Sequence, residues 1–467
     1  MGNKVKLGEL LSILTDYHAN GAYKKLKENV ELLDEPDFAV MIRTTNFEQE
    51  DFTNNLKYIN KHAYSFLAKS KVYPNDIIMN KIANAGSSYL MPDLKVPVSL
   101  AMNLFLLRVD AAKANPIYIY LYLRVNEAYV KSFANGSVTK TITKDAVRNL
   151  EIELPSRSIQ DRIAEQFICI NNKITLNRQI NQTLEQMAQT LFKSWFVDFD
   201  PVVDNALDAG FFEQDLAFSD ELLRRVEVRK AVRESDNFKP LSEDIRRLFP
   251  NAFEECTEPA LGLGGWVPKG WNNGCISDVA HYRTKRINTS ELTLTNYIST
   301  ENMLVDRKGI QKATALPTVN SVPAYTSGTI LISNIRPYFK KIWLAKGDGG
   351  YSNDVLGFEV KDQGTEEYLF NLMYQDSFFD FMMATSKGSK MPRGDKKAIL
   401  GLELVVPPLK LRKLFSKNVN GFYTSSSIRN NENHALGHLR DTLLPKLISG
   451  ELSLSNIKID IPEETLI

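Results

Sequence analysis

The chain of 467 residues repeats itself at an offset of 252 positions, and this repeat limits the folds that it can adopt. Residues 73–79 (YPNDIIM) lie against residues 325–331 (YTSGTIL), and residues 150–155 (LEIELP) lie against residues 402–407 (LELVVP). Farther on, Asn181 and Leu184 match Asn433 and Leu436. Identity between the halves is low, but the features keep one order and one offset. The chain is therefore predicted to contain two copies of one structural plan.

Each half begins with a segment of mixed character and ends in a helical one. Short β-like runs at residues 38–42, 77–79, 329–333 and 357–360 are separated by glycine, proline and asparagine turns. Helical patterns occupy residues 117–132 and 366–385. We therefore predict a mixed α/β (α+β) fold with two globular domains, each followed by a long helix.

The two long helices each carry an apolar stripe that becomes polar at its centre. The predicted seam positions are Ile163, Phe167, Ile170, Ile174, Asn181, Leu184 and Leu191 in the first helix, and Phe415, Val419, Phe422, Asn433, Leu436 and Leu443 in the second. Stripes of this kind are usually packing surfaces, and matching polar centres indicate that the helices pack on each other as an antiparallel coiled coil with pseudo-two-fold symmetry. About 40 residues per helix make a rod on the order of 60 Å long. Pro445 is expected to end or kink the second helix, with Gly450 as its stop.

Composition excludes several classes of protein. Apolar residues make up 43% and charged residues 24%, as in ordinary globular proteins. No apolar run approaches the roughly 18 residues of a membrane span, and the first residues lack the apolar core of a secretory signal. Cys169, Cys256 and Cys275 are too widely spaced for a zinc site or a disulfide framework. We therefore expect a cytoplasmic protein without membrane contact.

Charge is distributed unevenly along the chain. Residues 201–265 hold 14 acidic and 8 basic side chains, whereas the remainder holds 49 basic and 42 acidic ones. A modestly basic body with an acidic insert is compatible with nucleic-acid contact, although most proteins of such a balance bind no DNA.

Catalytic motifs are scarce. Residues 262–265 (GLGG) lack the full spacing of a dinucleotide-binding loop. Residues 115–118 (NPIY) lack the second proline of the adenine methyltransferase tetrapeptide, so Asn115 is interpreted as a helix N-cap. His434 and His438 have helical metal-ligand spacing but no acidic third ligand nearby, and are interpreted as surface residues. No catalytic and no metal site is predicted.

Two globular readers on a fixed spacer are suited to a bipartite ligand. A pseudo-two-fold protein can contact two DNA half-sites on one face of the duplex, about one helical turn (~34 Å) or somewhat more apart. Because the two halves differ in sequence, the two half-sites are expected to differ as well.

Several runs resemble a known family. Residues 154–164 (LPSRSIQDRIA), 174–185 (ITLNRQINQTLE) and 192–201 (FKSWFVDFDP) are similar to the central conserved region of the specificity subunits of type I restriction-modification systems. Residues 406–408 (VPP) and 443–452 (LLPKLISGEL) resemble their distal conserved region. Residues 266–271 (WVPKGW) and 331–338 (LISNIRPY) resemble parts of their second target-recognition domain. The resemblance covers nearly the whole chain and is weakest in residues 1–70.

The resemblance implies a non-catalytic specificity subunit. Its partners would be double-stranded DNA, two adenine methyltransferase subunits that bind S-adenosylmethionine, and restriction subunits; the chain itself would bind no cofactor. The expected organisation is a first target-recognition domain (1–155), a central conserved helix (156–200), an acidic linker region (201–260), a second target-recognition domain (261–407), a distal conserved helix (408–450) and a C-terminal tail (451–467). Large apolar groups clustered at the helix ends are candidate partner contacts: Phe192, Trp195, Phe196, Phe199, Leu443, Leu444 and Leu447.

Candidate DNA-binding residues are basic, amide and hydroxyl side chains that follow predicted strands or lie in glycine-containing loops, because these groups read base edges and grip phosphates. In the first domain they are Arg43, Thr44, Thr45, Asn46, Asn80, Lys81, Ser137 and Lys140. In the second they are Arg283, Lys285, Arg286, Ser299, Thr300, Asn334, Arg336, Lys387, Lys390 and Arg393. Each is also compatible with an ordinary solvated turn.

Two other functions stay open at the level of sequence. A fused methyltransferase or restriction enzyme would carry its own catalytic site, with a glycine-rich cofactor motif and an intact Asn-Pro-Pro-Tyr tetrapeptide. A coiled-coil scaffold would show no sequence-selective DNA binding at any salt concentration.

Overall fold

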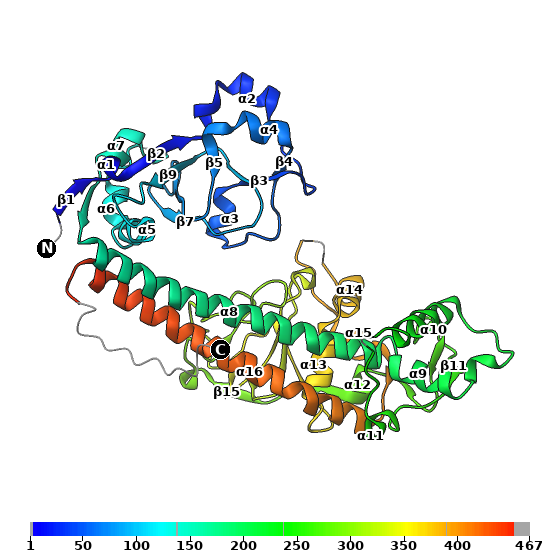
Figure 1. Ribbon diagram of the computed structural model, residues 1–467. Coiled ribbons are helices and arrows are strands. Elements are labelled where there is room, and N and C mark those ends of the chain that lie inside the picture. Colours follow the sequence, from blue (N-terminus) through cyan, green and yellow to red (C-terminus); the bar gives the residue numbers. More distant parts are fainter. Residues whose placement is uncertain (1–2, 137–138, 237, 389, 453–467) are drawn as a thin grey trace. The chain divides into compact units, whose positions relative to one another are not determined.

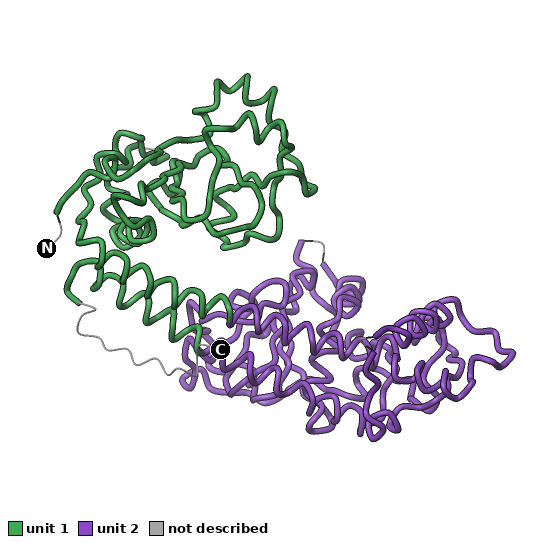
Figure 2. Tube along the Cα trace, in the orientation of Figure 1, with its two compact units in different colours: residues 1–176, 432–467 green, residues 177–431 purple. Residues whose placement is uncertain are grey.

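A computed structural model describes residues 3–136, 139–236, 238–388 and 390–452 (Figure 1). The chain forms two compact units, one of residues 1–176 and 432–467 and the other of residues 177–431 (Figure 2). Two helices of 40 residues, α8 (Arg157–Phe196) and α16 (Leu409–Ile448), contribute one part to each unit. Each unit therefore combines one mixed domain with a segment of paired helices.

The first mixed domain, residues 3–154, has two four-stranded sheets of order β2-β9-β6-β7 and β4-β3-β8-β5, and a ribbon of β1 with β10. Its strands are β1 (Asn3–Lys6), β2 (Leu11–Asp16), β3 (Ala39–Ile42), β4 (Tyr58–Ile59), β5 (Lys71–Val72), β6 (Ile77–Asn80), β7 (Ser88–Leu90), β8 (Val98–Leu100), β9 (Leu104–Val109) and β10 (Glu151–Leu154). Its helices are α1 (Leu7–Leu10), α2 (Tyr23–Asn29), α3 (Thr44–Glu48), α4 (Lys61–Phe66), α5 (Pro116–Val125), α6 (Glu127–Ser132) and α7 (Lys144–Arg148).

The second mixed domain, residues 272–406, has sheets of order β14-β21-β18-β19 and β15-β17-β20-β16, and a ribbon of β13 with β22. Its strands are β13 (Asn272–Cys275), β14 (Ala280–Tyr282), β15 (Arg286–Asn288), β16 (Tyr297–Ile298), β17 (Ser321–Tyr325), β18 (Ile330–Ser333), β19 (Ile342–Leu344), β20 (Gly349–Tyr351), β21 (Val355–Val360) and β22 (Glu403–Val406). Its helices are α12 (Ile276–Val279), α13 (Glu366–Tyr374), α14 (Asp376–Ala384) and α15 (Lys396–Leu400).

The two mixed domains share one topology. In the first sheet of each domain, the strand orders match position by position. In the second sheet, β3 is parallel to β8 and β5 is antiparallel to it, just as β16 is parallel and β17 antiparallel to β20. The domains differ at the edges of this sheet, where β4 extends the first domain and β15 extends the second on the opposite side. The predicted mixed fold and internal repeat are confirmed.

Each domain has three layers, and this explains its unbroken apolar strands. Ile77 and Met79 of β6 face the helix α5, whereas Ile78 faces the second sheet. In β18, Ile330 faces helices α13 and α14, and Leu331 faces the second sheet. Both faces of these central strands are therefore buried, so apolar residues follow one another without polar alternation.

The helix α5 begins as its sequence predicts. The Asn115 side chain accepts hydrogen bonds from the backbone N–H groups of Ile117 and Tyr118, and Pro116 occupies the first helical turn. An amide N-cap followed by proline is a strong helix start. The interpretation of residues 115–118 as a helix cap is confirmed.

The helices α8 and α16 run antiparallel, as predicted. In the first unit, Arg440 Nη1 lies 2.9 Å from Asn171 Oδ1, and Lys173 Nζ lies 3.6 Å from a carboxylate oxygen of Glu432. In the second unit, Asn181 Nδ2 donates to Asn430 Oδ1 at 2.9 Å. All the predicted seam positions are buried or half-buried. Helix α16 passes through Pro445 and ends at Ile448, two residues before Gly450, whose φ is +76°.

The acidic insert after α8 is a folded part of the second unit. It contains α9 (Asp200–Asp208), α10 (Asp220–Arg233), α11 (Glu243–Arg246) and the strands β11 (Phe253–Glu255) and β12 (Trp266–Pro268). Its aromatic residues Phe249, Phe253 and Trp271 share one core with Phe196 of α8 and Phe415 of α16. The insert therefore caps the end of the helix pair that lies in this unit.

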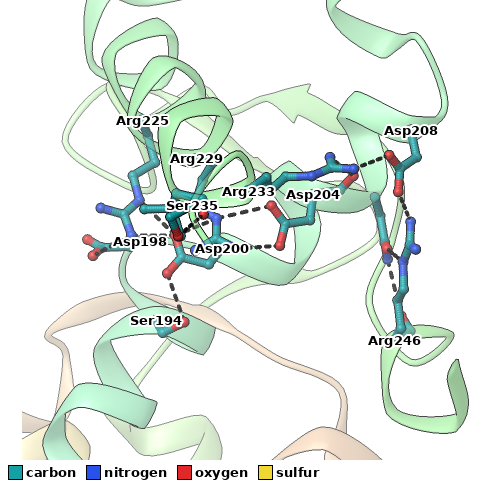
Figure 3. A network of polar contacts seen from close by, with 12 residues as sticks. Ser194, Asp198, Asp200, Asp204, Asp208, Arg225, Arg229, Arg233, Ser235 and Arg246 are labelled. Carbon is teal, nitrogen blue, oxygen red and sulfur yellow. Dashed lines mark hydrogen bonds and ion pairs between the residues drawn. The ribbon is translucent and has the colours of Figure 1, made fainter. Parts of the chain in front are cut away.

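A ladder of ion pairs joins α9 to α10 (Figure 3). Each rung links residues 25 positions apart: Arg225 Nε lies 2.8 Å from Asp200 Oδ1, Arg229 Nε lies 3.0 Å from Asp204 Oδ1, and Arg233 Nη2 lies 2.5 Å from Asp208 Oδ1. The aspartates recur every four residues on one helix and the arginines every four on the other, so that each series lines one helical face. The ladder pairs Asp204 and Asp208, two of the 14 acidic residues of the insert, and Asp200 just before it.

Candidate nucleic-acid interface

In each mixed domain, the central strand of the first sheet ends in polar residues. β6 ends at Asn80, and the N–H of Lys81 donates to the carbonyl of Asn103 at 2.9 Å. β18 ends at Ser333, and the N–H of Asn334 donates to the carbonyl of Asp354 at 2.8 Å. These matching bonds make Lys81 and Asn334 corresponding residues of the two domains.

A second loop meets this strand end in both domains. Ile82 forms a bridge with Thr141, which also pairs with Asn135; Ile335 forms a bridge with Arg393, which also pairs with Lys387. We call these assemblies the cradles: residues 80–83 with 135–136 and 139–141 in the first domain, and residues 333–336 with 387–388 and 390–393 in the second. Ser137, a predicted DNA contact of the first domain, lies outside the described residues, and Lys140 is exposed.

The cradles share a backbone conformation that side chains rarely adopt. Ala83 has a φ of +66°, and Arg336, its counterpart, has a φ of +51°. Left-handed conformations of residues other than glycine cost free energy, and they gather at functional sites. The same backbone conformation therefore presents the methyl group of Ala83 in the first domain and the guanidinium group of Arg336 in the second.

In the first domain, some of the candidate DNA-binding side chains form hydrogen bonds within the domain itself. Asn46 is 3% exposed; its Oδ1 accepts from the N–H of Arg43 at 3.0 Å, and its Nδ2 donates to the carbonyl of Asp51 at 3.3 Å. Arg43 donates to the carbonyl of Asn55 at 2.7 Å. The Asn46 amide closes the turn at the start of α3, and a DNA contact by Asn46 stays a prediction. Thr44 is half-buried and Thr45 exposed in that helix.

Lys81 faces a buried carboxylate. Its Nζ lies 3.2 Å from one oxygen of Asp16, and Lys144 Nζ lies 3.0 Å from the other. Burial opposes ionisation of Asp16, but the hydrogen bonds and charges of the two lysines outweigh it and hold the pKa of Asp16 below its ordinary value. Lys81 is therefore a partly neutralised cation.

Asn80, at the end of β6, is 1% exposed. Its Nδ2 donates to Tyr89 Oη at 3.3 Å, but its Oδ1 has no partner among the described residues. A buried acceptor without a partner is costly, and such groups need an explanation.

In the second domain, Arg283 is an internal residue. Its side chain is 5% exposed and forms an ion pair with Glu359, while its Nε donates to the carbonyl of Ala324 at 2.5 Å. Its charge is paired inside the domain, and a DNA contact by Arg283 stays a prediction. Arg286 donates to the carbonyl of Ser321 at 2.6 Å but stays exposed, as does Lys285.

Ser299 and Thr300 form a polar turn after β16. The N–H of Ser299 donates to Asn302 Oδ1 at 2.6 Å, and the carbonyl of Thr300 accepts from Lys341 Nζ at 2.6 Å. Asn302, 2% exposed, closes this turn just as Asn46 closes its counterpart in the first domain. Both hydroxyl residues are half-buried.

The second cradle gathers the remaining candidates. Arg393 Nη2 lies 3.0 Å from Asp354 Oδ1, and Lys387 Nζ lies 2.6 Å from Asp395 Oδ2. Lys390 is exposed. Asn334 is 8% exposed, and neither its Oδ1 nor Arg336 Nε has a partner among the described residues.

The apolar residues predicted to contact partner subunits are core residues. Phe192, Trp195, Phe196 and Phe199 are between 1% and 8% exposed in the core of the second unit. In the first unit, Leu444 and Leu447 are also buried and Leu443 half-buried, against the first mixed domain. These side chains pack the helices against the folded parts of their own units, and contacts of these residues with partner subunits stay a prediction.

The sequence analysis missed residues that shape the cradles. Lys144 shares Asp16 with Lys81, and Gly394 leaves room for the Asn334 amide, since a Cβ there would lie 2.9 Å from Asn334 Oδ1. Lys144 matches Lys396 at the repeat offset, a signal that could have drawn attention to it. Gly394 carries no comparable signal, because only the packing shows the close approach.

The described residues contain no group of three or more histidine, cysteine, aspartate or glutamate side chains placed to hold a metal ion. Among the same residues, no helix is both long and apolar enough to cross a membrane.

Comparison with known proteins finds similarity to one family. The sequence profile of the type I restriction modification DNA specificity domain matches residues 3–186, which contain the first mixed domain and most of α8. The HindI specificity subunit of Haemophilus influenzae is 25% identical over 82% of this chain and 88% of its own length. The chain is therefore similar to the specificity subunits of type I restriction-modification systems over most of its length.

Further members of this family agree with the match. The EcoDI specificity subunit of Escherichia coli is 23% identical over 72% of this chain and 70% of its own length. The crystal structure of a type I restriction-modification S subunit from M. genitalium covers 96% of both chains at 13% identity, with a TM-score of 0.50. That structure shows a shared fold.

Proposed function

We propose that this specificity subunit directs a type I restriction-modification complex to an asymmetric, bipartite DNA site with an unread spacer. The pair of cradles carries the proposal. They have one backbone plan, which suits one way of docking on a duplex, and different side chains, which suit different half-sites. Lys81 and Asn334 are the clearest example, because they occupy the same position with different hydrogen-bonding groups.

In this proposal, recognition and chemistry belong to different subunits. The chain binds double-stranded DNA and assembles in the cytoplasm with two adenine methyltransferase subunits, which hold S-adenosylmethionine, and with restriction subunits. The cradles include amide and cationic side chains, such as Asn80, Lys81, Asn334 and Arg336, the groups that recognise bases and phosphates. The acidic residues beside the second cradle, Asp354 and Asp395, are engaged in ion pairs with Arg393 and Lys387.

The helix pair serves as the spacer in this proposal. Residues 1–155 and 261–407 are the two target-recognition domains, the helices within 156–200 and 408–450 set the distance between them, and 201–260 link the halves. The seam of Asn181 with Asn430 supports this role, because polar pairs in a coiled coil fix its register.

Mapping methylated adenine across a genome tests the proposal. The chain is produced with its methyltransferase subunits in a host without other methylation, and the methylated motif is compared with that of a chain whose residues 1–155 come from a relative. One half of the motif is expected to change while the other half and the spacer stay the same. A change in both halves contradicts separate reading by the two domains.

The same strains distinguish the proposed function from the two alternatives, an enzyme and a coiled-coil scaffold. Methylation by the chain without its methyltransferase subunits would identify it as an enzyme. A complex that binds DNA without sequence preference at every salt concentration would identify a scaffold, since specific contacts retain selectivity when phosphate contacts are screened.

A further inference from the structure

Arg336 differs from the other candidate arginines because its side chain has no partner in the part of the chain that the structure describes. Arg43 donates to Asn55, Arg283 pairs with Glu359, Arg286 donates to Ser321 and Arg393 pairs with Asp354. For the Arg336 side chain, no hydrogen bond or ion pair is present among the described residues, and its Nε is buried. No described carboxylate therefore pairs with its charge.

The backbone of Arg336 is held by hydrogen bonds, although its guanidinium has no partner among the described residues. Its N–H donates to the carbonyl of Pro392 at 2.9 Å, and its carbonyl accepts from the N–H of Phe339 at 2.9 Å. The bridge between Ile335 and Arg393 holds the preceding residue. The backbone is therefore ordered before a ligand binds, and only the side-chain torsions of this cation are left to be ordered on binding.

A second orphan polar group lies two residues away. Asn334 is 8% exposed, and its Oδ1 has no partner in the described part of the chain. The first cradle also has a buried amide oxygen without a donor among the described residues, Asn80 Oδ1, but at the position of Arg336 it has Ala83. One of the differences between the two cradles is therefore a guanidinium group at one backbone position.

We propose that Arg336 is a specificity-determining residue, which reads a guanine in the half-site bound by the second domain, and that Ala83 leaves the first domain without this contact. Arginine donates to guanine O6 and N7 in the major groove, the commonest specific contact between proteins and DNA. A phosphate ligand is the competing assignment, and it would add affinity without selecting a base. The inference rests on the proposed function.

The test replaces Arg336 without changing the backbone. Arg336→Gly removes the guanidinium and suits the left-handed conformation, since glycine adopts positive φ readily. Ala83→Gly makes the same backbone change in the first cradle and is the matched control. Both variants are produced as the full complex with the methyltransferase subunits, and the methylated motifs are mapped.

The wild-type motif is expected to contain a guanine that becomes any base in the Arg336→Gly complex, while every other position and the Ala83→Gly motif stay unchanged. An unchanged motif in Arg336→Gly overturns the assignment. Uniformly weaker methylation of the same motif also overturns it, in favour of phosphate. If the wild-type complex has no motif at all, the proposed function fails and this inference fails with it.

A binding measurement covers the case in which Arg336→Gly does not assemble. Duplexes that carry the mapped motif have each guanine replaced in turn by 7-deazaguanine, which lacks the N7 acceptor. The wild-type complex is expected to lose about 5-fold or more in affinity at one guanine. If no guanine shows such a loss, the contact does not exist.

Discussion

Gln160 and Arg412, 252 residues apart, make the same contact at the starts of the two long helices. Gln160 Nε2 donates to the carbonyl of Pro155 at 2.8 Å, and Arg412 Nε donates to the carbonyl of Pro407 at 3.1 Å. Both side chains are buried. Each then ties the helix to its mixed domain, Gln160 by accepting from the N–H of Asn115 and Arg412 by pairing with Asp362. The joint between domain and helix is therefore part of the repeat.

Replacing either residue should loosen its joint. We expect Gln160→Ala to lower the free energy of unfolding by about 1–3 kcal/mol, because it leaves buried polar groups without partners. Arg412→Ala should cost about 3 kcal/mol, since it strips a buried ion pair of one member. Calorimetric unfolding of each variant measures these losses. Gln182→Ala, on the exposed surface of α8, is the control, and equal effects of all three variants would contradict the special role of the joints.

The cluster of Asp16, Lys81 and Lys144 should make the first domain sensitive to acid. The pKa of Asp16 is lowered in the folded protein, so its contribution to stability is present above the unfolded pKa and is lost as the pH falls through the folded pKa. We expect Asp16→Asn to cost about 2 kcal/mol at pH 7. Urea unfolding at neutral pH and at about pH 3 measures the difference between variant and wild type, which should shrink in acid. A difference independent of pH would show that charge plays no part.

The ion-pair ladder should carry much of the stability of the insert. Arg229 is only 12% exposed and pairs with Asp204 through two nitrogen atoms. Arg229→Ala is expected to cost about 3 kcal/mol because it leaves a partly buried carboxylate unpaired. Arg229→Lys should recover part of this loss, since lysine keeps the charge but not the two-point geometry. Arg224→Ala, on the exposed face of α10, should change stability by less than about 0.5 kcal/mol. Thermal unfolding measures the series, and a Lys variant as unstable as the Ala variant would argue against a charge effect.

The architecture could be predicted from the sequence, because it depends on periodic and repeated patterns. The seam from Ile163 to Leu191 marks α8, and the polar centre at Asn181 indicates its antiparallel partner. The candidate interface could be predicted only in part. Asn46 and Arg283 have the residue types of DNA contacts, but their roles depend on partners such as Glu359, which is 76 positions from Arg283. Sequence neighbours give no sign of such a pairing.

Phe196 shows the same difficulty for the predicted partner surface. It lies beside Val197, and the two residues are equally apolar in the sequence, but Phe196 is 8% exposed and Val197 is 40% exposed. The difference arises because Trp271 and Tyr368 cover Phe196, at ring-centroid distances of 6.2 Å and 5.1 Å. Both covering residues come from segments far along the chain, so burial here is a property of the tertiary fold.

If Phe196 is a core residue, its replacement should destabilise the isolated chain. If it is only a docking residue, the stability of the isolated chain should not change. If it is a core residue, Phe196→Ala leaves a cavity and lowers the free energy of unfolding by about 3–5 kcal/mol without any partner present. Val197→Ala removes an exposed side chain and should change stability by about 0.5 kcal/mol or less. Denaturant unfolding of the two variants, followed by titration with the methyltransferase subunits, separates stability from assembly. A Phe196→Ala chain that unfolds like the wild type but fails to bind the methyltransferase would indicate the docking role.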